Sequence, residues 1–126
     1  MIKGKVIAGK GKGKELGFAT ANIKLNRKID SGVYSGRVKV DRKEYLAAIF
    51  IDKDLLEAYI LDFSDNIYGR EIEVIVEAKI REVMKLESEK ELVEQIKKDV
   101  KEVKSWKLKV KSNFEFTFNF QLSTLY

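Results

Sequence analysis

GVYSGRVKV at Gly32–Val40 and YLAAIFI at Tyr45–Ile51 are the two stretches that decide the fold. The first alternates, with Tyr34, Val38 and Val40 on one side. Alternation with a period of two predicts a β-strand with one buried face. The second is a continuous apolar run of strand length, which predicts a strand buried on both faces near the centre of a sheet.

Further short strands are expected on both sides of this pair. Lys3–Ala8, Leu55–Leu61 and Glu71–Ala78 have strand-like patterns and are separated by glycine-rich or polar turns. The side chains of the last stretch that are expected to face inward are Ile72, Val74, Val76 and Ala78. Short strands at this spacing predict a mostly β fold, in the form of a small closed antiparallel barrel.

The C-terminal third contains one helix signal and one further strand signal. Ser88 with Glu91 three residues later is a capping box, and it predicts a helix over about 89–104 that lies across the barrel. The apolar stripe of that helix is Leu92, Ile96, Val100 and Val103. Beyond it, FEFTFNF at Phe114–Phe120 alternates and predicts an extra strand over about 112–122, with an aromatic face covered by the barrel or by a partner.

The amino-acid composition limits which metal sites and catalytic residues the protein can have. The 126 residues are 44% apolar and 36% charged, which suits one folded domain over 1–126. The absence of Cys and His excludes thiolate zinc sites, disulfides and Ser-His-Asp triads. Any metal is then a hard cation on oxygen ligands, and any catalytic base is a carboxylate, Lys or Tyr.

No apolar run reaches membrane-spanning or signal-peptide length, so a cytoplasmic location with no membrane partner is expected.

The net charge of +5 is concentrated at the N-terminus. Residues 1–28 contain eight Lys or Arg and one acidic residue, Glu15, together with five of the eight glycines. Positive charge on a glycine-rich backbone suits phosphate, because bare amides can approach the oxygens. A solvated lysine face on a loop is an equally good alternative on composition alone.

The glycine-rich segment does not form a standard phosphate loop. Gly4–Lys10 nearly spells a Walker A motif, but Gly11 stands where Ser or Thr is needed, and G-x-G-x-x-G fails because Lys14 holds its third glycine position. Thr20 and Asn22 follow, two residues apart on an expected extended backbone, so both face the same side. Their oxygens could help to hold Mg²⁺ at nucleotide phosphates, although satisfying a turn is the commoner use of such residues.

Glu57 interrupts an apolar row. On the expected strand Leu55–Leu61 it shares a face with Leu55, Tyr59 and Leu61. A carboxylate in such surroundings is a candidate general base. An outward-facing Glu on a strand is nevertheless the commoner pattern.

Four motifs in order resemble the ATP-dependent riboflavin kinase family. They are GKGKGKELGFATANI at Gly9–Ile23, GVY at Gly32–Tyr34, EAYILDF at Glu57–Phe63 and IYG at Ile67–Gly69. The Ile80-Arg81 pair and the capped helix continue the match, which covers about residues 4–101. The resemblance implies a six-stranded barrel with a C-terminal helix. It also implies transfer of the terminal phosphoryl group of ATP to the ribityl 5′-hydroxyl of riboflavin, which yields FMN.

The resemblance also implies roles for individual residues. Thr20 and Asn22 match residues that bind Mg²⁺, or another hard divalent cation, and the nucleotide phosphates. Glu57 matches the catalytic base, and Arg81 is a candidate flavin-binding residue. The glycine-rich loop residues expected at the nucleotide phosphates are Gly9, Lys10, Gly11, Lys12, Gly13, Lys14 and Gly17. The sequence departs from the family pattern at Ala19, within 47–56, and at Val83 and Leu86.

Two alternatives stay open. The chain could be a non-catalytic relative that binds a flavin or nucleotide, or a basic nucleic-acid-binding barrel. The latter is disfavoured because Phe18 is the sole aromatic side chain of the basic segment. The resemblance to longer bacterial relatives, which carry an N-terminal adenylyltransferase that makes FAD, leads us to expect that this chain acts without such a module and that FMN is its end product. A monomer, or a weak oligomer formed through the aromatic tail, is expected.

Overall fold

The computed structural model describes residues 1–8 and 19–105, in which six strands and a helix form. The strands are β1 (Ile2–Lys5), β2 (Ala19–Lys24), β3 (Gly32–Val40), β4 (Lys43–Asp52), β5 (Leu55–Ile60) and β6 (Glu71–Arg81). The helix occupies residues 89–105. Within the described ranges, no helix has both the length and the apolar character needed to cross a bilayer.

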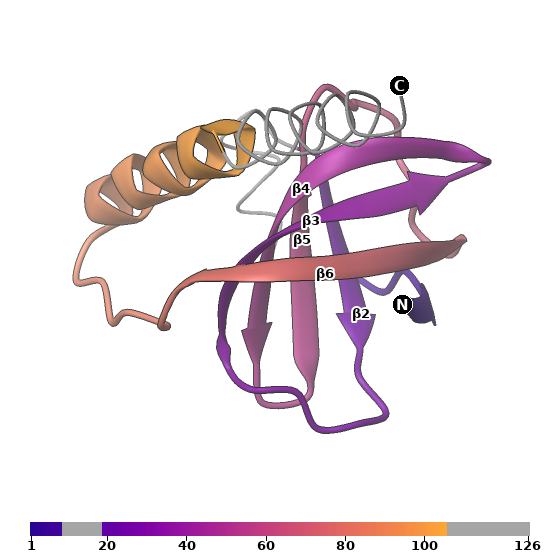
Figure 1. Cartoon of the computed structure of the whole chain (residues 1–126), viewed down its shortest axis with the longest axis horizontal. Helices are drawn as coiled ribbons and strands as arrows, with labels where there is room; N and C mark the ends of the chain where they lie inside the picture. Colours follow the sequence, from indigo (N-terminus) through magenta and orange to yellow (C-terminus); the bar gives the residue numbers. More distant parts are fainter. Residues whose placement is uncertain (9–18, 106–126) are drawn as a thin grey trace, which may run out of the picture.

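The six strands form one nearly closed antiparallel barrel. Their order is β1-β6-β3-β4-β5-β2, and every neighbouring pair is antiparallel (Figure 1). The two edges approach each other where the backbone N–H of Ile7 donates to the carbonyl oxygen of Asn22 at 2.8 Å. The predicted barrel is confirmed. The first strand ends at Lys5 rather than Ala8, and the predicted strand over 112–122 lies outside the described residues.

Alternating side chains of the central strands fill the barrel. Tyr34, Val38 and Val40 point inward as predicted, and they pack against a cluster that includes Ile49 and Ile51 of β4. Each of these isoleucines is fully buried, which stabilises the fold by about 1.5–3 kcal/mol per side chain. β4 lies between β3 and β5, so the prediction of a central strand is correct.

β6 departs from simple alternation because its pairing with β3 shifts register twice. Ile72 and Val74 point inward as predicted. After the first shift Ala78 pairs with Ser35, which lies on the outer face of the barrel, so the prediction that Ala78 points inward is wrong. A β-bulge places one extra residue in a strand and thereby reverses which side the following residues face.

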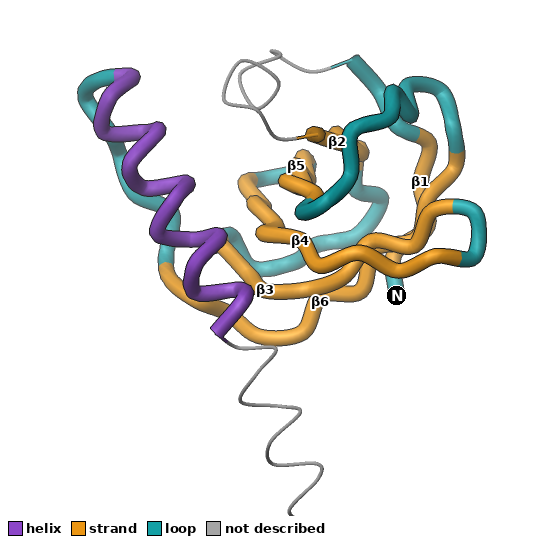
Figure 2. The backbone as a smooth tube through the Cα atoms, turned by 90° about the horizontal axis from the view of Figure 1, so that it is seen from above, coloured by secondary structure: helices purple, strands orange, loops and turns teal. Residues whose placement is uncertain are grey.

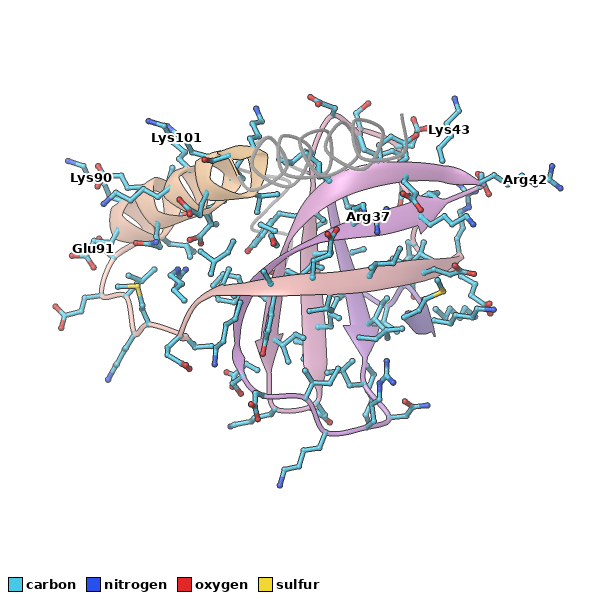
Figure 3. The ribbon with its side chains drawn as sticks, in the orientation of Figure 1. Arg37, Arg42, Lys43, Lys90, Glu91 and Lys101 are labelled. Atoms are coloured by element: carbon cyan, nitrogen blue, oxygen red, sulfur yellow. The ribbon has the colours of Figure 1, made fainter. Side chains whose placement is uncertain are left out.

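The helix lies outside the ring of strands (Figure 2). Its cap forms as predicted: Ser88 Oγ accepts from the Glu91 backbone N–H at 3.2 Å, while the Glu91 carboxylate accepts from the backbone N–H of Glu87 at 3.0 Å. The apolar stripe packs on the outer face of β4 and β5, against a cluster made of Ala48, Tyr59, Leu61, Ile96, Val100 and Val103. Lys90 and Lys101 point away from the barrel (Figure 3).

Candidate functional site

One row of side chains crosses the outer face of five strands. Each member is the direct cross-strand partner of the next: Asn22 on β2, Glu57 on β5, Phe50 on β4, Val33 on β3 and Arg81 on β6. Directly opposite residues of antiparallel strands point to the same side of a sheet. The row is on the outer face, because Phe50 packs against the cluster beneath the helix. Residues far apart in sequence therefore become neighbours.

Thr20 lies beside this row. It is the cross-strand partner of Tyr59, and it is two residues from Asn22 on the same face of β2. The structure thus brings together the three side chains singled out in the sequence, Thr20, Asn22 and Glu57. Asn22 is 5% exposed, while Thr20 and Glu57 are partly exposed. Thr20, Asn22 and Glu57 together form an oxygen-rich corner, in which the carboxylate of Glu57 is partly open to solvent.

Glu57 has two aromatic neighbours. Burial raises the pKa of the Tyr59 hydroxyl well above its ordinary value, and a side-chain hydrogen bond with Glu57 raises that pKa further. A protonated Tyr59 therefore orients the Glu57 carboxylate over the whole range of ordinary pH. The rings of Phe50 and Tyr59 meet edge to face, with centroids 6.3 Å apart and an interplanar angle of 88°.

Arg81 closes the other end of the row. Its Nε and Nη2 donate to the two carboxylate oxygens of Asp99, on the helix, at 2.9 and 2.8 Å. Its guanidinium carbon is 5.3 Å from the centroid of the Phe50 ring. In the described structure the partners of Arg81 are protein groups, so its candidate role in binding flavin remains a prediction.

Sequence patterns alone give no functional role to Phe50, Tyr59 or Asp99. Asp99 carries a recognisable signal, since it is an acidic residue beside the apolar stripe of the helix and is 3% exposed. Phe50 is one of two aromatic residues in the apolar run on β4, and it packs against the cluster on the outer face of the barrel. Neither position could be connected to Glu57 without the strand register.

The oxygen ligands at this corner suit a hard cation. Within the described ranges, no group of three or more acidic side chains gathers to hold a metal ion. The hydroxyl of Thr20 and the amide oxygen of Asn22 nevertheless fit Mg²⁺, which takes a few protein oxygens and completes its shell with water and phosphate. Such a donor set predicts that a cation would bind together with a polyphosphate rather than alone.

The predicted loop residues from Gly9 to Gly17 lie outside the described part of the chain. The residues that flank it are placed: Ile7 pairs with Asn22, and Ala19 begins β2. The chain therefore enters and leaves the Gly9–Gly17 loop beside the oxygen-rich corner. Two hollows in the described surface lie elsewhere, and they are lined by Met1–Lys3, Leu25–Lys28, Lys53 and Asp54.

Comparison with known sequences identifies relatives of the chain. Residues 1–107 match the sequence profile of a family described as Flavokinase: Riboflavin kinase. A bifunctional riboflavin kinase/FMN adenylyltransferase from Haemophilus influenzae is 38% identical over 116 residues, which cover 83% of this chain and 38% of that protein. An RNA-binding riboflavin kinase from Bacillus subtilis is 34% identical, with 79% of this chain and 48% of that protein covered. The chain thus spans less than half the length of these relatives.

Solved structures share the fold. A riboflavin kinase from Trypanosoma brucei superposes with a TM-score of 0.60 and 29% identity, covering 82% of this chain and 76% of that one. The crystal structure of a macrolide-efflux protein from Streptococcus pneumoniae superposes with a TM-score of 0.76 and 30% identity. It is covered over 38% of its length, and this chain over 82%.

Proposed function

The chain belongs to the flavokinase (riboflavin kinase) family, and from this premise we propose that it transfers the terminal phosphoryl group of ATP to the 5′-hydroxyl of riboflavin. The products are FMN and ADP. The single observation that carries the proposal is the pairing of Asn22 with Glu57 on the outer face of the barrel. It puts a candidate base directly beside a candidate cation ligand, as phosphoryl transfer to an alcohol requires.

Glu57 is the proposed general base. Its carboxylate takes the proton of the ribityl 5′-hydroxyl while that oxygen bonds to the terminal phosphorus and the bond from phosphorus to ADP breaks. Asn22 is its cross-strand partner on one side and Phe50 on the other. We therefore place the nucleotide phosphates on the Asn22 side and the flavin on the Phe50 side. Tyr59, through its hydrogen bond, keeps the carboxylate oriented.

Thr20 and Asn22 are the proposed protein ligands of a divalent cation, with Mg²⁺ as the expected ion. A cation there would offset the negative charge of the phosphate oxygens when the nucleotide is bound. The lysines and backbone amides of Gly9–Gly17 are proposed to contact the same phosphates, because the two ends of that segment start at this corner. Asn22 is 5% exposed, so the packing around it limits the movement of its side chain.

The test is direct turnover. Purified protein is incubated with riboflavin, a divalent cation and each of a panel of nucleoside triphosphates, and the flavins are separated by chromatography. FMN formation with ATP and Mg²⁺, abolished by chelation, is the expected result. Thr20→Ala and Asn22→Ala are expected to raise the Mg²⁺ concentration needed for half-maximal rate. Riboflavin binding without FMN formation under any donor would instead establish a non-catalytic flavin-binding relative.

A further inference from the structure

A buried ion pair joins β6 to the helix. The Asp99 carboxylate accepts hydrogen bonds from Nε and Nη2 of Arg81, and one more from Nε2 of Gln95 at 3.1 Å. The side chains of Arg81 and Asp99 are 15% and 3% exposed. A bidentate, charge-assisted contact with so little solvent around it fixes the plane of the guanidinium.

Arg81 connects the ion pair to the row of side chains on the outer face of the barrel. Its Nη1 donates to the carbonyl oxygen of Glu82 at 3.0 Å, which fixes the first residue after β6. The guanidinium reaches Phe50 although the two residues lie on strands separated by β3. Val33 is the partner of both and is fully buried, so the long arginine spans about 10 Å, two strand spacings, across a small side chain.

Phe50 lies between Arg81 and Glu57, the proposed base. It is the direct cross-strand partner of Glu57, and its ring meets that of Tyr59 edge to face. Tyr59 in turn hydrogen-bonds Glu57. A continuous set of contacts therefore runs from the helix to the flavin side of Glu57.

We propose that Asp99 and Arg81 are positioning residues, which hold the Phe50 ring in place and so set how riboflavin lies against Glu57. The inference rests on the proposed function. Phe50 is two strand steps from Arg81 and Asn22 is four, about 19 Å along the sheet, so the ion pair lies closer to the flavin side of Glu57 than to the nucleotide side. Loss of the pair therefore disturbs riboflavin far more than ATP.

Steady-state kinetics of Asp99→Asn and Arg81→Lys test this proposal at a temperature where circular dichroism shows each variant folded. The expected result is a rise of at least tenfold in KM for riboflavin, with KM for ATP within twofold of wild type. Glu77→Gln, which breaks the exposed pair with Arg37, is the matched control and leaves both constants unchanged. Unchanged constants in Asp99→Asn with a lower Tm would reduce the pair to a structural brace and overturn the proposal. Equal rises in both KM values would also overturn it.

A second variant covers the case in which Asp99→Asn does not fold. Phe50→Leu keeps the ion pair and removes the ring, and the same riboflavin-specific rise is expected. If wild type forms no FMN, the proposed function fails by itself. Titration of riboflavin fluorescence then decides the inference: at least tenfold weaker binding by both Asp99→Asn and Phe50→Leu supports it, and unchanged binding, or none by wild type, overturns it.

Discussion

Two arginines on the outer face of the barrel make similar ion pairs in different surroundings. Arg37 on β3 donates from Nε to Glu77 at 2.8 Å and from Nη1 to Glu44 at 2.7 Å, with these side chains 29–42% exposed (Figure 3). Arg81 makes contacts of 2.9 and 2.8 Å with Asp99, and these two side chains are only 15% and 3% exposed. Distances alone would rank the two networks as equals.

Burial separates them. An exposed pair is screened by water and contributes about 0–1 kcal/mol, whereas removing one partner of a buried pair leaves a desolvated charge and costs about 3–5 kcal/mol. The hydrogen bond to Glu77 raises the pKa of the Arg37 guanidinium, but that group is charged at every ordinary pH in any case. The Arg81 network is therefore the one that can constrain a neighbouring site.

Substitution of Glu57, the proposed base, should have the strongest consequence. Glu57→Gln keeps the shape of the side chain but cannot take the proton, so kcat for FMN formation should fall by about 10²–10⁴-fold. Glu44→Gln, at the exposed network, should leave kcat unchanged. Steady-state assays at saturating riboflavin and ATP measure both kcat values. Wild-type turnover in Glu57→Gln would remove Glu57 as the base.

The two networks should also differ in how much they contribute to the free energy of unfolding. Asp99→Ala leaves the Arg81 guanidinium buried without its carboxylate, and the free energy of unfolding should fall by about 3–5 kcal/mol. Urea denaturation monitored by circular dichroism gives this value. A loss below about 1 kcal/mol would mean that the buried pair behaves like the exposed one.

Tyr59 gives a smaller, pH-dependent effect. Because its pKa is raised on folding, Tyr59 stays protonated in the folded state while the unfolded chain loses that proton above about pH 10. Stability from this residue is therefore complete below pH 10 and declines above it. Tyr59→Phe should cost about 1 kcal/mol at pH 7 and show a shallower decline between pH 9 and 11 in urea titrations. Tyr68→Phe, at a residue 65% exposed, should track wild type throughout.

The smallest effect is expected at the exposed network. Glu77→Gln should change the free energy of unfolding by less than about 1 kcal/mol, and 1 M NaCl should erase the difference. Urea denaturation at low and high salt measures it. A salt-independent loss of several kcal/mol would show that exposure does not separate the networks.

Local sequence patterns predicted much of the fold. β3 begins and ends where the alternation does, at Gly32 and Val40, and the helix begins directly after the Ser88 cap. These signals need only the pleat of a strand and the unpaired amides at a helix start. Ala78 was placed wrongly because a register shift depends on the partner strand. Gly36 stands at that shift, where a Cβ would overlap the Ile75 carbonyl oxygen and the Ile49 side chain.

The candidate site was only partly accessible from the sequence. Thr20, Asn22 and Glu57 could be singled out, but their roles rest on resemblance and stay predictions, as do a cytoplasmic location, the oligomeric state and the absence of nucleic-acid binding. That Asn22 and Glu57 are partners follows from β2 pairing with β5. That Arg81 meets Phe50 across Val33 follows from β3 lying between β4 and β6.

By itself, the amino-acid sequence predicted the helix and most of the strands, β2 excepted, and it excluded His and Cys chemistry. Both conclusions depend on residue types and on spacings of a few residues. Only the tertiary structure decided which strands are neighbours, in what register, and therefore which polar side chains meet. The physical reason is that pairing between distant strands depends on the packing of the whole barrel, which no short window of sequence contains.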